Sequence, residues 1–169
     1  LTVEKKEADP EAVKALLLQA LNAALDDFDA MREREGARLA EDILGRAETI
    51  STLTGQVEAR APVLAEAYRN RLYAKLQEVL GSTQIDEGRI LTEVAIYADK
   101  VAVDEETVRL RSHLSQLHQM LEQGGAVGRK LDFLIQEFNR EANTIGSKCN
   151  DTDLARVVVD IKAEIEKIR

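Results

Sequence analysis

The chain has 169 residues, of which 44% are hydrophobic and 32% charged, with a net charge of -8 and a pI of about 4.9. This length allows one domain with a sizeable core, and an aromatic content of 4% without tryptophan favours helices over a β-sandwich. Phosphate neutralisation normally needs a basic surface, so the acidic balance argues against tight, non-specific nucleic-acid binding by this chain alone.

Cys149 is the single cysteine, which excludes an internal disulfide and favours a reducing, cytoplasmic location. No apolar run approaches the roughly 20 residues that a membrane-spanning helix needs, so no membrane association is expected. The chain begins at Leu1 without a methionine and stops at Arg169 within a helical pattern. We therefore expect residues 1–169 to be a single helical domain, the C-terminal region of a longer protein.

The first predicted helix begins at Asp9-Pro10, where a capping aspartate precedes a proline at the first helical position. Apolar residues then recur at the i, i+3, i+4, i+7 spacing of a helix face that packs in a core. These residues are Val13, Leu16, Leu17, Ala20, Leu21, Ala24, Leu25, Phe28 and Met31.

The apolar stripe becomes narrow over residues 32–80, and the charges near its start alternate in sign. A narrow stripe is typical of a helix in contact on one side only, so we predict a protruding helical arm that stands clear of the core. Proline removes a backbone donor, so Gly55 and Pro62 predict a kink or a turn between Thr54 and Pro62. Gly81-Ser82-Thr83 is predicted to close the arm.

Four shorter helices are predicted beyond the arm. One runs from about Ile85 to Val101, and the next begins at a capping Asp104 and stops at Gly124-Gly125. A third covers residues 128–148, and a last one follows a capped turn at 150–152. The sequence therefore predicts an all-α fold of long antiparallel helices, with a protruding helical hairpin packed on a smaller helical bundle.

Glu106, Arg109 and His113 share one side of the helix 104–123, at the boundary between its leucine stripe and solvent. A half-buried histidine beside a carboxylate suits a general base or a metal ligand. Considered alone, however, these residues favour a structural histidine over either of those roles.

The helix 128–148 has one apolar face, and its other side is rich in Asn, Arg, Gln, Thr and Ser rather than in the residues of an ordinary exposed face. Its acids include Glu137 and Glu141, which repel each other at i, i+4 unless a cation lies against them. Arg140 or a divalent ion could supply that charge, since Mg²⁺ and Mn²⁺ bind carboxylates and Mn²⁺ also accepts imidazole. Paired glutamates are common on plain helices, so the spacing alone does not decide.

The segment GRKLDFLIQEFNREANTIGSK at 128–148 closely resembles the signature of the C-terminal domain of the YicC/YloC-like endoribonuclease family. DEETVRLRSH at 104–113 is similar to a second characteristic stretch of that family. A looser resemblance extends from about Asp9 to Arg169 and departs from the family pattern at Ala102. Family members are divalent-metal-dependent ribonucleases that assemble as hexamers and carry an N-terminal domain, which nothing in this chain is expected to resemble.

The resemblance implies an endoribonuclease that cleaves RNA phosphodiester bonds with Mn²⁺ or Mg²⁺ and forms a homo-oligomer. It implies His113, Glu137 and Asp132 as catalytic residues. Metal ligands are expected among Glu106, His113, Glu137 and Glu141. RNA contacts are expected from Arg109, Arg129, Lys130, Arg140, Asn143 and Lys148.

A second reading is a helical oligomerisation or interaction module without catalytic activity of its own. In that case the polar face of the helix 128–148 is a subunit contact, whose Asn and Arg residues satisfy one another. Composition and periodicity establish only an acidic, mostly helical domain, and the enzymatic reading rests on the resemblance.

Overall fold

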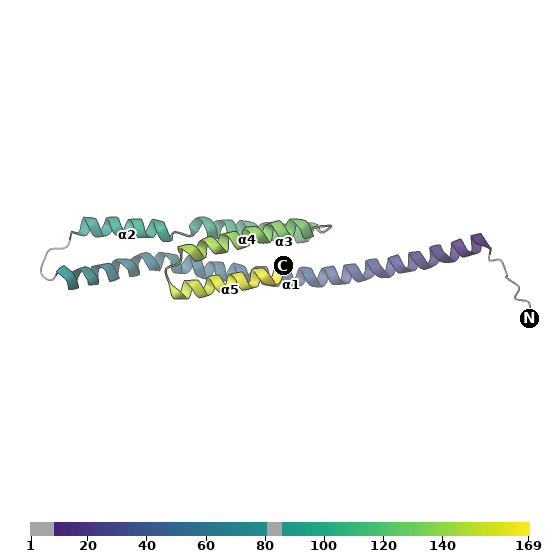
Figure 1. Cartoon of the computed structure of the whole chain (residues 1–169), viewed down its shortest axis with the longest axis horizontal. Coiled ribbons are helices and arrows are strands. Elements are labelled where there is room, and N and C mark those ends of the chain that lie inside the picture. Colours follow the sequence, from purple (N-terminus) through teal and green to yellow (C-terminus); the bar gives the residue numbers. More distant parts are fainter. Residues whose placement is uncertain (1–8, 81–85) are drawn as a thin grey trace, which may run out of the picture. The chain divides into compact units, whose positions relative to one another are not determined.

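The computed structural model describes residues 9–80 and 86–169, and all regular structure in them is helical. The helices are α1 (Pro10–Leu80), α2 (Glu87–Val101), α3 (Asp104–Gln123), α4 (Gly128–Lys148) and α5 (Thr152–Ile168), as labelled in Figure 1. The all-α prediction is confirmed. The predicted closing turn at 81–83 lies outside the described residues. None of the described helices is long and apolar enough to cross a membrane.

The chain divides into two compact units, with the boundary between Asp42 and Ile43 inside α1. In the first unit, α1 begins at the predicted residue, where the backbone N–H of Glu11 donates to Oδ1 of Asp9 at 3.1 Å. The expected burial of this segment is wrong. Its large apolar side chains are between 42% and 66% exposed, namely Val13, Leu16, Leu17, Leu18, Leu21, Leu25, Phe28 and Met31. Periodicity identifies an apolar face, but it does not reveal whether the face has a partner within the same unit.

In the second unit, one stripe of α1 lies in the core. The buried positions are spaced by three, four or seven residues, which is the spacing of a one-sided helix contact. They are Ala47, Ile50, Thr54, Val57 and Leu64. The apolar members of this stripe pack in one cluster with residues of α3, α4 and α5. The prediction that residues 32–80 stand clear of the core is therefore wrong for 47–64, where the narrow stripe is a bundle contact.

α1 continues without a turn through Pro62. A proline inside a helix costs about 3 kcal/mol, because it removes one hydrogen bond and clashes with the preceding turn. Val57 and Leu64 are buried on either side of Pro62, which itself is exposed. Packing on both sides offsets the local cost, so the predicted turn is absent.

The last turns of α1 and helix α2 form the hairpin. The ring of Tyr68 stacks on that of Tyr97, with centroids 3.9 Å apart and planes 8° apart. Figure 1 shows α2 alongside the end of α1. The hairpin predicted within residues 32–80 is wrong, because α1 runs unbroken to Leu80. The helical hairpin in the structure is formed by the end of α1 and by α2.

α3, α4 and α5 complete the bundle. Gly124 and Gly125 have φ of 64° and 83°, conformations that favour glycine, and they end α3 as predicted. Asp104 does not cap α3 as predicted, because it is already the first helical residue and the cap position is Val103, without a side-chain hydrogen bond. Asp151, within the predicted capped turn at 150–152, caps α5 by accepting a bond of 3.0 Å from the backbone N–H of Leu154.

Three ion pairs connect the second-unit part of α1 to the other helices. Arg46 donates to Glu164 of α5 at 3.3 Å, and Arg60 binds Asp151, the α5 cap, at 3.0 Å. Arg111 of α3 holds both carboxylate oxygens of Glu58 at 2.7 and 2.6 Å. These pairs fix α1 against α5 and α3, the second of which carries part of the candidate site.

Candidate functional site

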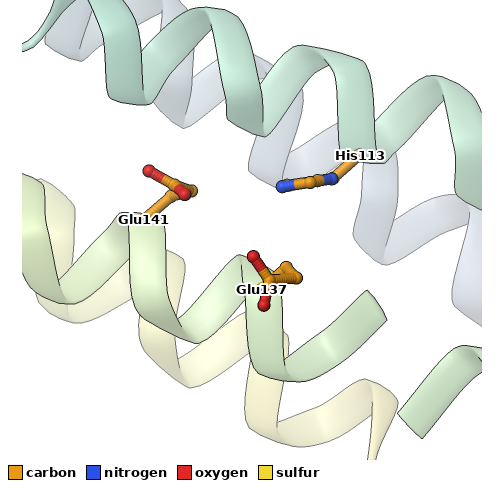
Figure 2. A group of neighbouring side chains, drawn as sticks. All are labelled: His113, Glu137 and Glu141. Atoms are coloured by element: carbon orange, nitrogen blue, oxygen red, sulfur yellow. The ribbon is translucent and has the colours of Figure 1, made fainter. Parts of the chain in front are cut away.

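Three side chains that could hold a metal ion face one another across the α3–α4 hairpin. Figure 2 shows His113 of α3 pointing toward Glu137 and Glu141 of α4. Each offers one ligand atom, and these atoms all lie within 4.8 Å of one another. Glu137 and Glu141 are one helical turn apart, so both reach the same side of α4, and the short turn after α3 sets His113 opposite them.

His113 has buried ring nitrogens without a bonded partner. Neither Nδ1 nor Nε2 has a hydrogen-bond partner among the described residues. The ring meets Phe138 edge-on, with centroids 6.0 Å apart and planes 77° apart, and Phe138 is fully buried. A buried polar group without a partner costs about 1–3 kcal/mol, so this arrangement is unusual for a purely structural histidine.

Glu141 is held by one oxygen and free at the other. Its side chain is 1% exposed, and Oε2 accepts a hydrogen bond of 2.9 Å from Nε of Arg109. Oε1 is buried and has no partner among the described residues. Hydrogen bonding to the Glu141 carboxylate raises the pKa of Arg109 above its ordinary value, which keeps this cation charged. Arg109 therefore fixes the carboxylate and leaves one oxygen directed at the site.

Glu137 lies at the outer edge of the group. Its side chain is 45% exposed, and Oε2 accepts a hydrogen bond of 3.2 Å from Arg140, which is itself largely exposed. The predicted cation beside the Glu137–Glu141 pair is therefore Arg140 for Glu137, and Arg109 from the neighbouring helix for Glu141. The site has a buried side at Glu141 and an accessible side at Glu137.

Glu106 lies in a neighbouring cluster rather than in the group around His113. Its side chain is 3% exposed, and its oxygens accept bonds of 3.0 and 3.1 Å from Nζ of Lys148. A further bond of 3.3 Å comes from Arg109, which also pairs with Glu105. Lys148 in addition donates to the backbone carbonyl of Ala102 at 2.9 Å. Two of the five cations predicted to bind RNA, Arg109 and Lys148, thus neutralise buried acids.

The other predicted site residues are placed apart from His113. Asp132 is exposed and lines a hollow of about 220 Å³ with Gln136, Asn139 and Arg169 among its walls. A separation of five residues turns a helix by roughly 140°, which explains why Asp132 does not join Glu137. The exposed residues Arg129, Lys130 and Asn143 complete the predicted set.

Sequence reasoning missed two contributions to this site. It assigned Arg109 to RNA, although the side chain hydrogen-bonds Glu141, and it gave no role in the site to Phe138, whose ring meets that of His113 edge-on. The spacing of Glu106, Arg109 and His113 was a usable signal for one face of α3. The pairing across to α4 depends on the packing of two helices, which no pattern within either helix contains.

The donor set suits a divalent cation. One imidazole nitrogen and two carboxylate oxygens are ligands that Mn²⁺ accepts, whereas Mg²⁺ prefers oxygen alone. The buried nitrogens of His113 and Oε1 of Glu141 have their bonding capacity unused within the described structure. His113, Glu137 and Glu141 are therefore the residues that could hold such an ion.

The chain matches two family models. Residues 57–169 match the C-terminal domain of the YicC-like endoribonucleases, and residues 1–41 match their N-terminal region. It is 44% identical over 168 residues to a probable endoribonuclease YicC of Clostridioides difficile (strain 630), covering 99% of this chain and 57% of the relative. The corresponding protein of Haemophilus influenzae (strain ATCC 51907 / DSM 11121 / KW20 / Rd) is 38% identical over 167 residues, covering 99% and 58%.

This chain thus spans less than two thirds of the length of these curated relatives. The expectation that nothing in it resembles the N-terminal part of the family is wrong, because residues 1–41 match that region. The apolar periodicity of residues 13–31 resembles that of any core helix, so it gave no sign of a second region. The match of residues 57–169 shows that the chain belongs to the YicC-like endoribonuclease family.

Proposed function

We propose that this chain carries the catalytic centre of a divalent-metal-dependent endoribonuclease that cleaves RNA phosphodiester bonds in the cytoplasm. The observation that carries the proposal is the convergence of His113, Glu137 and Glu141, in which buried nitrogen and oxygen atoms lack partners among the described residues. The names of the relatives, probable endoribonucleases, support RNA as the substrate.

His113, Glu137 and Glu141 would hold the ion, with Mn²⁺ the better match to a set that includes imidazole. When bound, such an ion supplies Lewis-acid stabilisation of phosphoryl charge and lowers the pKa of a coordinated water. Arg109 keeps Glu141 oriented, which removes the need to reorganise a buried charge when the ion binds.

The accessible side of the site is where a phosphodiester would approach. Arg140 is 69% exposed beside Glu137, and its guanidinium can bind phosphate oxygens while offsetting their charge. Glu137, at the same edge, would accept the proton of the attacking hydroxyl or water. In this proposal, Asp132 has no part in the first contacts around the ion, because it lies outside the group.

Two measurements on the same variants test the proposal. Mn²⁺ binding is measured by titration calorimetry, and cleavage of a labelled structured RNA is followed with Mn²⁺, Mg²⁺ or EDTA. His113→Ala and Glu141→Gln are expected to weaken Mn²⁺ binding at least tenfold and to abolish cleavage. His118→Ala and Glu122→Gln, exposed positions on the same helix as His113, serve as matched controls and should retain both.

Unchanged Mn²⁺ affinity in His113→Ala and Glu141→Gln would rule out this metal site. Cleavage that persists in EDTA would rule out metal dependence altogether. End-group analysis of the products then separates two nucleophiles, because attack by water leaves a 5′-phosphate or 3′-phosphate, whereas attack by the 2′-hydroxyl leaves a 2′,3′-cyclic phosphate.

The oligomerisation module remains the second candidate, favoured by the exposed apolar face of residues 13–31. Such a face on one helix normally marks a contact surface. This reading predicts that the double substitution Leu17→Gln/Leu21→Gln lowers the mass measured by light scattering and leaves Mn²⁺ binding unchanged. An unaltered mass would count against it.

A further inference from the structure

The hairpin formed by the end of α1 and by α2 differs in its charges from the bundle. Within the second unit, six of the eight arginines of the described bundle pair with a carboxylate, Arg129 and Arg169 being the other two. The six are Arg46, Arg60, Arg109, Arg111, Arg140 and Arg156. On the hairpin, Arg69, Arg71 and Lys75 form no ion pair with any described residue. These three cations fall in AYRNRLYAKLQ, residues 67–77, which contains no acid in a chain of net charge -8.

The tyrosines are concentrated in the same place. All three tyrosines of the chain, Tyr68, Tyr73 and Tyr97, belong to the hairpin. Tyr68 and Tyr97 stack on each other, and the guanidinium of Arg71 lies 5.6 Å from the centre of the Tyr68 ring. Tyr68 and Tyr97 therefore have a structural role, because their stacked rings join α1 to α2. Tyr73 takes no part in this stack.

Tyr73 and Arg69 line two adjoining hollows. One, of about 400 Å³, runs along α1 and is bounded by Arg69, Asn70, Tyr73, Ala74 and Gln77. The other, of about 60 Å³, lies between the two helices, and its wall includes Glu87, the single acid among the lining residues of the two hollows. The larger hollow therefore offers an aromatic ring, a guanidinium and two side-chain amides with no carboxylate in its wall.

We propose that this surface of the hairpin, centred on Arg69 and Tyr73, binds a single-stranded segment of RNA away from the His113 site. Cations without carboxylate partners are available to phosphates, and a ring beside them can stack on an unpaired base without regard to sequence. The amides of Asn70 and Gln77 can bond base edges or the 2′-hydroxyl. The inference rests on the proposed function for its choice of RNA, and it adds a second point of contact to it.

The surface also accounts for how an acidic chain can hold a polyanion. Most bundle carboxylates near the candidate site are neutralised by their own arginines and lysines, so little positive charge remains there for a long strand. A separate patch with three unpaired cations supplies that charge at another place on the same unit. Binding at the patch is then expected to depend on salt and not on metal.

The test is fluorescence anisotropy of a labelled single-stranded RNA with the whole chain, in EDTA, over a series of salt concentrations. Arg69→Gln/Arg71→Gln is compared with Arg156→Gln/Lys162→Gln, which removes the same charge from exposed positions on α5. We expect about tenfold weaker binding and a salt dependence lower by about 1.4 in slope for the hairpin variant only, as for two lost phosphate contacts to a single strand. Tyr73→Ala is expected to weaken binding by about tenfold, with Tyr73→Phe close to wild type.

Equal binding by the hairpin and α5 variants would overturn the inference, as would a wild-type chain that binds no RNA in EDTA. Circular dichroism of each variant separates a lost contact from a lost fold, and Tyr73→Phe gives a second comparison with little change in packing. The proposed function is judged independently by Mn²⁺ affinity at His113. If the hairpin variant binds Mn²⁺, cleaves RNA and binds RNA as tightly as the wild type, the proposed function stands and only the proposed RNA-binding surface is refuted.

Discussion

Arg109 on α3 donates a hydrogen bond of 2.9 Å from Nε to Oε2 of Glu141 on α4, and Glu141 is 1% exposed. The same guanidinium also contacts Glu105 and Glu106 on its own helix. One cation thus serves three carboxylates and joins the group that could hold a metal to the adjacent cluster of Glu106 and Lys148. We propose that its role is to position Glu141 rather than to touch the substrate.

Replacing Arg109 with Gln should loosen Glu141 and weaken Mn²⁺ binding by about tenfold, because residues that orient metal ligands commonly contribute tenfold or more to affinity. Titration calorimetry measures the effect. Arg111→Gln is the matched control, since Arg111 is on the same helix but pairs with Glu58. If the two variants bind Mn²⁺ alike, the positioning role is refuted. In the cleavage assay, a fall in kcat with little change in KM for Arg109→Gln would support a positioning role over contact with the substrate.

Mn²⁺ should stabilise the wild-type chain against unfolding, because only the folded state brings His113, Glu137 and Glu141 together. At a free ion concentration of one hundred times the Kd, the expected gain is about 2.7 kcal/mol. Thermal melts with and without Mn²⁺ report it as a rise in Tm. His113→Ala should lose most of this rise, and His118→Ala should keep it; an equal rise in all three would place the ion elsewhere.

Lys148→Met should lower the free energy of unfolding by about 3 kcal/mol, since it leaves the buried carboxylate of Glu106 without its closest cation. The double substitution Glu106→Gln/Lys148→Met removes both charges and should regain much of the loss. Urea unfolding of the wild type, both single variants and the double variant completes the cycle. An additive double variant would show that Lys148 and Glu106 do not interact.

The cap of α5 should make stability depend on acid. Hydrogen bonds from Arg60 and from the backbone of Leu154 lower the pKa of Asp151 below its ordinary value. The folded pKa lies below the unfolded one, so the stabilisation is fully present above about pH 4 to 5 and is lost as pH falls through the lowered folded pKa. The difference in unfolding free energy between wild type and Asp151→Asn, which keeps a capping side chain, should therefore shrink on acidification.

Asp151→Ala removes the cap as well as the charge and should lower stability by about 1 kcal/mol even where Asp151→Asn and wild type have converged. Urea titrations at neutral pH and near pH 3 provide the comparison. A difference between wild type and Asp151→Asn that stays constant over this range would contradict the assigned coupling to Arg60.

Much of the fold follows from local signals. The bounds of α3 and α4 were predictable because the glycines at 124 and 125 interrupt two regular apolar stripes. The capped turn at 150–152 likewise indicated where α5 begins. Two predictions about α1 failed for a different reason. The apolar stripe of residues 47–64 was expected to be exposed and is buried, whereas that of residues 13–31 was expected to be buried and is exposed. Burial depends on which other helices are present, and an apolar stripe in one helix does not identify its partner.

The residues of the candidate site could be picked out from spacing alone, whereas their grouping, with Glu106 added, came from the family resemblance. His113, Glu137 and Glu141 were each visible as chemically capable residues, and the structure brings them within 4.8 Å. Glu106 is also a carboxylate and shares the α3 face with His113, but its side chain forms an ion pair with Lys148. That choice between a metal ligand and an ion pair depends on the cross-helix distances at the end of α4, which sequence spacing does not contain. The hairpin surface was not predicted because its signal is a short run of residues, 67–77, that contains three cations and no acid.

The turn at residues 124–127 joins the two helices that carry the whole candidate site. Contacts between neighbours in sequence form at a small loop-closure cost and therefore early in folding. The α3–α4 hairpin can accordingly bring His113 to Glu137 and Glu141 before α1 docks on the bundle. A divalent ion bound at that stage would stabilise the transition state, so its effect is expected in the rate of refolding more than in the rate of unfolding.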